Sequence, residues 1–331
     1  MFRSRFWPRY CLAALTSSTC EDTVSRGAPM WKCSGVIPVV MFEDLKPDID
    51  CIAEGDTSPI LCSQTISEFS TSSGTSGGEW KLIPTTEEEI QRRFLLDDLA
   101  MPLMNQFNPD LDKGKAMRFT FRKSEFKTAG GIVAQPLLTI INKRRHNKNY
   151  TSPHEAILCQ DSYPSMYTQL LCGLCQNTQV VHIGSTFASS LLRAIKFLEK
   201  NWALLCRDIR MECCKESWHG IVRQLWPNTK CVDAVVTGTM SQYVPMLEYY
   251  FNGLPLVSYI YASSECYFGL NLDPLCKPSD LSYTLIPTLA YFEFLTVNRD
   301  HGFDNVVSNE PVLDHKEDQL EVVDLVDVKL G

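Results

Sequence analysis

The stretch Ser70–Lys81 reads S-T-S-S-G-T-S-G-G-E-W-K, and it predicts a loop that binds phosphate. Glycine permits close backbone approach and positive φ, so this run can offer several N–H and O–H donors to one anion. Lys81 adds a cation at the end of the run. The Gly-x4-Gly-Lys-Ser/Thr pattern is absent, which argues against the mechanism of the common kinases and GTPases.

The residues after this run predict that the loop enters a helix. Thr85 with Glu88, or Thr86 with Glu89, has the spacing of a capping box. An apolar face is expected to continue through Ile90, Phe94, Leu95 and Leu99, within a helix over residues 86–105.

Two other interpretations of the run remain open. A stretch rich in Ser, Thr and Gly is often only a flexible linker. Gly74–Gly78 also matches the Gly-x-Ser-x-Gly nucleophile elbow, which would make Ser76 a hydrolase nucleophile. An elbow follows a buried apolar strand, whereas the residues over 68–73 are mostly polar, which disfavours this alternative.

Composition indicates a globular protein of one large or two ordinary domains. The chain has 331 residues, of which 44% are hydrophobic, and its net charge is -8. Such an acidic balance argues against nucleic acid and anionic membranes as partners, because both need a positive surface. The basic run over residues 143–148 is interpreted as a solvated loop.

The fourteen cysteines lie in apolar segments rather than at the spacing of a disulfide framework. Cys172 and Cys175 form a C-x-x-C in a helical run, and we interpret them as core residues rather than a redox or metal pair. Reduced thiols favour a cytoplasmic location. The apolar run at Cys11–Leu15 is too short for a secretory signal, and residues 1–35 are interpreted as an irregular leader.

Strand and helix patterns alternate along the chain, which predicts an α/β fold. Between residues 34 and 62, short strands are expected at 36–40 and 59–62, and helices are expected over 162–175 and 186–202. Strands are expected over 117–122, 231–237, 254–261 and 325–330, the last after an acidic run over 314–327. Ligands of such sheets collect beyond the carboxyl ends of the strands, here at 238–243 and 262–266.

The segment Tyr261–Glu265 supplies an aromatic ring, two hydroxyls and one carboxylate. An adenine ring could stack on Tyr261, and the serines could donate to a phosphate. Glu265 could hold Mg²⁺, which prefers carboxylate and phosphate oxygens. Alone this segment is also an ordinary helix-cap sequence, so its meaning depends on the phosphate loop.

Together these segments resemble the plant acyl acid amido synthetases, which conjugate auxin and jasmonate and belong to the firefly-luciferase-like adenylate-forming superfamily. The resemblance covers most of the chain from about Val36, and the sequences of its motifs are most similar to those of the indole-3-acetic acid branch. It rests on four segments: Thr71–Ser76, Leu171–Asn177, Thr237–Tyr243 and Tyr261–Gly269.

The resemblance implies an adenylate-forming large domain of mixed sheets flanked by helices. It also implies ATP and Mg²⁺ as cofactors, and an acyl acid such as indole-3-acetic acid and an amino acid as partners. Ser73 and Glu265 would be catalytic, with Glu265 also the metal ligand. Nucleotide binding would involve Ser70, Ser72, Ser73, Gly74, Thr75, Lys81, Thr239, Tyr261, Ala262, Ser263, Ser264 and Glu265. The acyl acid would contact Thr139, Ser258, Tyr259, Ile260 and Tyr261.

The sequence also departs from this family. Trp80 stands where the family usually has a basic residue, and Thr139–Asn142 replaces its Thr-Ser-Tyr-Tyr segment. Compared with the family, a helical segment is expected to be deleted around Met211, and the Tyr-Arg-x-Gly-Asp motif does not occur. We therefore expect residues 36–331 to be an incomplete N-terminal adenylation domain with internal deletions and without the C-terminal domain. The alternative to an impaired amido synthetase is an inactive remnant that binds nucleotide weakly or acts only through partners.

Overall fold

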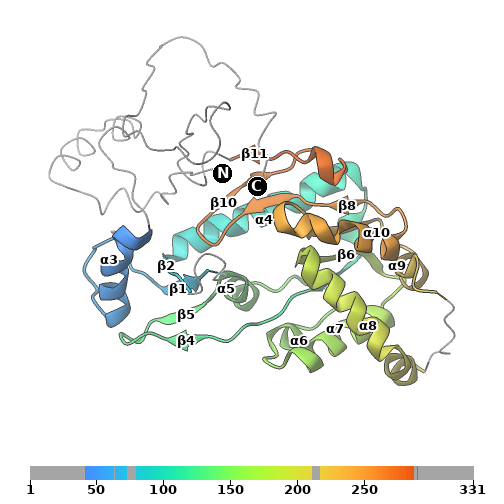
Figure 1. Ribbon diagram of the computed structural model, residues 1–331, viewed down its shortest axis with the longest axis horizontal. Helices are drawn as coiled ribbons and strands as arrows, with labels where there is room; N and C mark the ends of the chain where they lie inside the picture. Colours follow the sequence, from blue (N-terminus) through green and yellow to red (C-terminus); the bar gives the residue numbers. More distant parts are fainter. Residues whose placement is uncertain (1–41, 63, 73–79, 211–216, 287–288, 290–331) are drawn as a thin grey trace, which may run out of the picture.

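A computed structural model describes residues 42–62, 64–72, 80–210, 217–286 and 289 (Figure 1). Several predicted features fall outside these ranges: the leader, the strand at 36–40, the centre of the phosphate loop at 73–79, the joint at Met211, and the C-terminal acidic run and strand. The described residues form three sheets with helices packed around them.

The first sheet, here called the cradle sheet, carries the phosphate loop. Its four strands have the order β2-β1-β5-β4, with β1 antiparallel to β2 and parallel to β5. The strands are β1 (Glu68–Thr71), β2 (Leu82–Thr85), β4 (Phe126–Lys127) and β5 (Val133–Pro136). Strand β1 is one of the two internal strands of this sheet, and every one of its residues is buried.

Helix α3 (Phe42–Glu54) packs against the cradle sheet and corrects the prediction of short strands in this region. Ile49 and Ile52 are buried against Phe69 of β1. The aspartates of this segment suggested turns, but the helix runs through them and also through Pro47, which lies inside it and removes one backbone N–H from its hydrogen bonds. Residues 59–62, also predicted as a strand, form a bend.

Helix α4 (Glu87–Phe107) follows β2 directly. The hydroxyl of Thr86 accepts the N–H of Glu89 at 3.3 Å, which confirms the predicted cap. The predicted apolar face is confirmed at Ile90, which is fully buried, but it is wrong at Leu95 and Leu99, which are 49% and 44% exposed. Besides Ile90, the buried stripe contains Arg93, Leu96, Ala100 and Met104.

The second sheet, here called the parallel sheet, has the order β3-β6-β7-β8, with all neighbouring strands parallel. Its strands are β3 (Lys115–Phe119), β6 (Val180–Phe187), β7 (Cys231–Val235) and β8 (Leu256–Val257). Helices cover one face of this sheet: α7 (Ser162–Cys175), α8 (Ala188–Ile209), α9 (Ile221–Leu225) and α10 (Val244–Phe251). Figure 1 shows this half at the opposite end of the molecule from α3.

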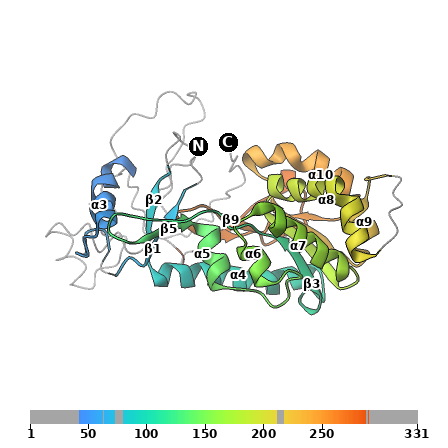
Figure 2. The same cartoon turned by 90° about the horizontal axis from the view of Figure 1, so that it is seen from below.

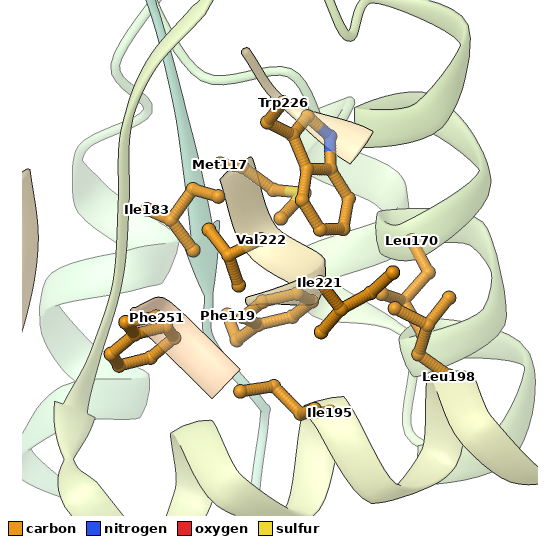
Figure 3. A pocket seen from close by; sticks show the side chains of 10 residues that line it. All are labelled: Met117, Phe119, Leu170, Ile183, Ile195, Leu198, Ile221, Val222, Trp226 and Phe251. Atoms are coloured by element: carbon orange, nitrogen blue, oxygen red, sulfur yellow. The ribbon is translucent and has the colours of Figure 1, made fainter. Parts of the chain in front are cut away.

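The main apolar core lies between the parallel sheet and these helices. Side chains from β3, β6 and all four helices converge around a small cavity (Figure 3). The cavity has a volume of about 10 Å³, and all its lining side chains are apolar apart from the indole N–H of Trp226, which donates to the Gly173 carbonyl at 2.8 Å. It is therefore a packing void and not a ligand site.

The third sheet, here called the hairpin sheet, corrects the prediction of one buried strand over 254–261. That segment splits into β8 of the parallel sheet and β9 (Ile260–Ala262) of the hairpin sheet. The hairpin sheet has the order β11-β10-β9, with β10 (Tyr267–Leu270) antiparallel to both neighbours and β11 at Thr284–Leu285. The turn between β9 and β10 contains the second predicted motif.

Short helices complete the described chain: α5 (Leu137–Arg144), α6 (His154–Leu158), and the 3-10 helices η2 (Leu111–Lys113), η3 (Gly238–Tyr243) and η4 (Pro278–Asp280). The basic run begins in the last turn of α5 and continues from residue 145 as the mostly exposed loop that was predicted, but two of its arginines are ion-paired. Arg144 contacts Glu68 and Glu87, and Arg145 contacts Asp98.

The described cysteines are free thiols. Cys172 is half-buried and Cys175 is exposed on α7, so the interpretation of both as core residues is wrong for Cys175. Among the described residues, no group of three or more His, Cys, Asp or Glu side chains is arranged to hold a metal. Within the same ranges, no helix combines the length and apolar character needed to span a bilayer.

Candidate nucleotide-binding site

The phosphate loop is the connection of a β-hairpin. The Ser72 N–H donates to the Lys81 carbonyl at 3.0 Å, and the Lys81 N–H donates to the Ser72 hydroxyl at 3.1 Å. The loop therefore leads from β1 into antiparallel β2, and only then into α4. A nucleophile elbow needs a strand followed directly by a helix, so this connection disfavours Ser76 as a hydrolase nucleophile.

The structure describes three of the residues predicted from this motif. Ser70 is fully buried on β1, its N–H donates to the Thr85 hydroxyl at 3.3 Å, and its own hydroxyl has no partner among the described residues. The Lys81 ammonium lies 3.6 Å from the Glu43 carboxylate and over the ring of Phe42. Ser72 closes the hairpin as described above, whereas Ser73, Gly74 and Thr75 lie outside the described ranges.

The second motif forms a tight turn between β9 and β10. The Ser263 hydroxyl accepts the N–H groups of Glu265 and Cys266 at 3.2 and 3.4 Å, and the Ser263 N–H donates to the Cys266 carbonyl at 2.8 Å. Ala262 and Glu265 are exposed, and Ser264 is half-buried. The turn thus satisfies its own backbone donors and leaves the Glu265 carboxylate at the surface.

Tyr261 lies in an aromatic stack next to this turn. Its ring centroid lies 4.4 Å from that of Phe268 and 5.4 Å from that of Tyr283. The Tyr283 hydroxyl lies 2.8 Å from the hydroxyl of buried Ser258 and also bonds to Thr237. Sequence reasoning missed Tyr283, because its neighbours come from three separate segments and no local pattern marks it.

The remaining predicted residues are placed as follows. Thr239 is exposed in η3, at the carboxyl end of β7, as the sheet rule predicts. Thr139 is buried on α5, where its hydroxyl accepts the Lys123 N–H at 3.2 Å. Tyr259 and Ile260 pack in the apolar cluster that contains Leu96 of α4.

Helix α4 connects the two motifs. It begins at Thr86, next to the base of the phosphate-loop hairpin, and Arg93 lies two turns later, about 11 Å along the axis. There the Arg93 guanidinium donates to the carbonyls of Ser263, Ser264 and Glu265. Figure 2 shows α4 running from the cradle sheet towards β3. One local pattern could have pointed to Arg93, namely its i,i+4 spacing from Glu89.

The face of the parallel sheet away from the main core carries a buried charged row. Arg118 on β3, Gly184 on β6 and Asp233 on β7 lie side by side in the register of the sheet. Arg118 Nη1 lies 2.5 Å from Asp233 Oδ2, and His182 Nε2 lies 2.5 Å from Asp233 Oδ1. Burial opposes ionisation of Asp233, but Arg118 and His182 hold its pKa below the usual range.

Asp97 on α4 lies close to this row. Burial raises the pKa of the Asp97 carboxyl to about 6, although Arg118 and Arg145 oppose that shift. The folded chain therefore holds a proton on Asp97 that the unfolded chain releases near pH 4. The free energy of unfolding consequently falls as the pH rises from about 4 to about 6.

Asp97→Asn is expected to remove this dependence. The amide keeps the size of the side chain without its charge, so the variant should gain about 2 kcal/mol over the wild type at pH 7 and nothing below about pH 4. Urea unfolding at several pH values measures the difference between the two proteins. A difference that does not change between these pH values would contradict the assignment.

The arrangement fits a nucleotide with a divalent cation. A stacked tyrosine ring, a serine-rich turn and an exposed carboxylate adjoin α4, the helix that follows β2 of the phosphate-loop hairpin. Carboxylate and phosphate oxygens are the ligands that Mg²⁺ prefers, and a half-buried ring suits the face of a purine.

Comparisons with known proteins bear on the fold and the family. The chain aligns with the AtGH3.15 acyl acid amido synthetase in complex with 2,4-DB at a TM-score of 0.78 and 39% identity, covering 87% of this chain and 57% of that one. The GH3 acyl acid amido synthetases have the adenylate-forming fold, so the predicted fold class is confirmed.

Curated relatives lead to the family. The chain is 56% identical over 336 residues to indole-3-acetic acid-amido synthetase GH3.6 of Arabidopsis thaliana, covering 89% of this chain and 55% of the relative. It is 51% identical to the probable indole-3-acetic acid-amido synthetase GH3.4 of Oryza sativa subsp. japonica, covering 89% and 52%. It thus spans about half the length of these relatives. The GH3 family N-terminal domain matches residues 34–213 and 209–256, and the chain belongs to the GH3 family.

Proposed function

We propose that this chain contributes the nucleotide-binding half of an ATP-dependent amido synthetase that joins an amino acid to indole-3-acetic acid. The observation that carries the proposal is α4, which begins at the phosphate-loop hairpin and holds the Ser263–Glu265 turn through Arg93. The identity to relatives named as indole-3-acetic acid-amido synthetases supports this choice of acyl acid.

The reaction would have two steps. A carboxylate oxygen of the acyl acid attacks the α-phosphorus of ATP, which forms an acyl-adenylate and releases pyrophosphate. The amine of the amino acid then attacks the acyl carbon and displaces AMP. Fixed donors lower the barrier of the first step, because they stabilise the negative charge that develops on phosphate oxygens.

The described residues suggest how the nucleotide would be held. Tyr261 would stack on the adenine, with Phe268 and Tyr283 supporting its ring. Ser264 would donate to a phosphate, and Glu265 would hold Mg²⁺, which would neutralise phosphate charge. Ser73 and Thr75 remain proposed phosphate ligands.

The acyl acid would lie against Ser258–Tyr261. Tyr283 fixes the Ser258 hydroxyl at one end of this segment, and Tyr259 and Ile260 supply apolar surface. An indole ring needs such a surface with few polar groups. The free thiols of the described cysteines fit our further proposal that the protein works in the cytoplasm.

Exchange of labelled pyrophosphate into ATP tests the first step alone. We expect exchange that depends on indole-3-acetate and Mg²⁺. Equal exchange with fatty acids, or without any acid, would contradict the auxin assignment. No exchange together with no binding of Mg·ATP would contradict the proposed function as a whole.

A further inference from the structure

One buried cation, the Arg93 guanidinium, donates hydrogen bonds to three successive carbonyl groups of the second motif. Arg93 is 2% exposed. Its Nη1 lies 3.4 Å from the Ser263 oxygen, and its Nη2 lies 3.1 and 2.9 Å from the oxygens of Ser264 and Glu265. Hydrogen bonds from a charged donor are about twice as strong as neutral ones, and their strength increases where water is excluded.

Two neighbours fix the guanidinium from its other sides. The Glu89 carboxylate, one helical turn earlier, accepts Nε at 3.0 Å and also contacts Nη2. The Tyr267 ring centroid lies 5.2 Å from the guanidinium carbon, within the range of a cation–π contact. Arg93 therefore has one orientation, set by α4 and by the first residue of β10.

The contacts constrain the turn in a particular way. The backbone N–H groups of Glu265 and Cys266 are already bonded to the Ser263 hydroxyl. Arg93 donates to the carbonyl groups of the turn. Hydrogen bonds therefore hold both the N–H groups and the carbonyl groups of this backbone, and the Glu265 side chain is left at the surface. The cation also offsets the partial negative charge of three carbonyl oxygens near the place where phosphates would lie.

We propose that Arg93 is a positioning residue, which holds the Ser263–Glu265 turn in the conformation that binds Mg·ATP. This inference rests on the proposed function. Arg93 does not touch the nucleotide; it acts through the turn. Glu89 orients the guanidinium, and α4 transmits the position of the phosphate-loop hairpin to the turn.

Arg93→Met tests the proposal, with Arg92→Met as the matched control. Arg92 forms the parallel i,i+4 ion pair with the exposed Glu88, one residue earlier on the same helix. We expect Arg93→Met to weaken Mg·ATP binding about tenfold or more, and to change indole-3-acetate binding by less than about twofold. Arg92→Met should bind both ligands like the wild type.

Amide hydrogen exchange supplies a readout that does not depend on nucleotide. In Arg93→Met, a peptide that covers residues 261–267 should exchange faster, and a peptide from β7 should not change. If the wild type binds no Mg·ATP, the proposed function fails, whereas the exchange rates still decide whether Arg93 holds the turn. If Arg93→Met matches the wild type in nucleotide binding, or leaves exchange in the turn unchanged, the positioning role is overturned.

Two further variants cover a failure of Arg93→Met to fold, because that change leaves the buried Glu89 charge unpaired. Glu89→Gln with Arg93→Met removes both charges together, and it should show the same loss of Mg·ATP binding. Arg93→Lys keeps the charge but has no planar fork to reach three carbonyls, so we expect about a tenfold loss here too. Binding by Arg93→Lys equal to that of the wild type would overturn the proposal.

Discussion

Gly184→Ala is expected to lower the free energy of unfolding by about 3–5 kcal/mol. A Cβ atom at this position would lie 1.6 Å from Asp233 Oδ1, so the carboxylate must leave its place. The largely buried Arg118, whose side chain is 18% exposed, and the buried His182 would then lose their shared partner. Breaking a buried ion pair costs this much because the desolvated charge that remains is not compensated. Urea unfolding followed by circular dichroism measures the change.

Thr186→Ala is the matched control for this experiment. Thr186 lies on the same strand, two residues further along, and it is only half-buried. We expect its substitution to change the free energy of unfolding by less than about 1 kcal/mol. If Gly184→Ala were as stable as Thr186→Ala, the row of Arg118, Gly184 and Asp233 would not have the geometry described here.

Ser73→Ala combined with Glu265→Ala is expected to abolish binding of Mg·ATP. The first change removes a hydroxyl of the phosphate loop, and the second removes the proposed ligand of the cation. Two charge-assisted contacts of about 1.5–3 kcal/mol each would lower the affinity by several powers of ten. Isothermal titration calorimetry with ATP and Mg²⁺ measures this loss.

Cys172→Ala combined with Cys175→Ala serves as the comparison. Both residues lie on α7, which packs behind the parallel sheet and takes no part in either motif. We expect this variant to bind Mg·ATP within about twofold of the wild type. Equal losses in the two double variants, with both still folded, would indicate that the phosphate loop and the turn are structural only.

Sequence patterns predicted those elements whose signals are local. Helix α7 has the predicted bounds, because its apolar spacing is regular and Asp161 caps it. The start of α4 follows from the cap at Thr86. By contrast, periodicity cannot tell when a run leaves one sheet and joins another, so the split of residues 254–261 into β8 and β9 was missed.

The two motifs of the candidate site could be predicted from the sequence, but the residues that hold them in place could not. Ser263 and Glu265 stand out in the sequence because hydroxyl and carboxylate groups gather there. Arg93 and Tyr283 do not, because their meaning comes from partners in distant segments. The error over Leu95 and Leu99 has the same origin. The buried face of α4 contains a charged residue, Arg93. It therefore differs from the face that a search for apolar residues alone selects.

The connectivity of the parallel sheet has a consequence for how the chain reaches its native state. Strand β3 pairs with β6, although the whole segment between Phe119 and Val180 separates them in the sequence. Strand β6 pairs with β7, from which α8 and α9 separate it. Closing these long loops costs conformational entropy before the strands form stabilising contacts. Folding should therefore be slow compared with that of helical domains of similar size. Until they pair, the apolar strands β6 and β7 are exposed and can associate with other unfolded chains. Refolding from denaturant should therefore compete with aggregation.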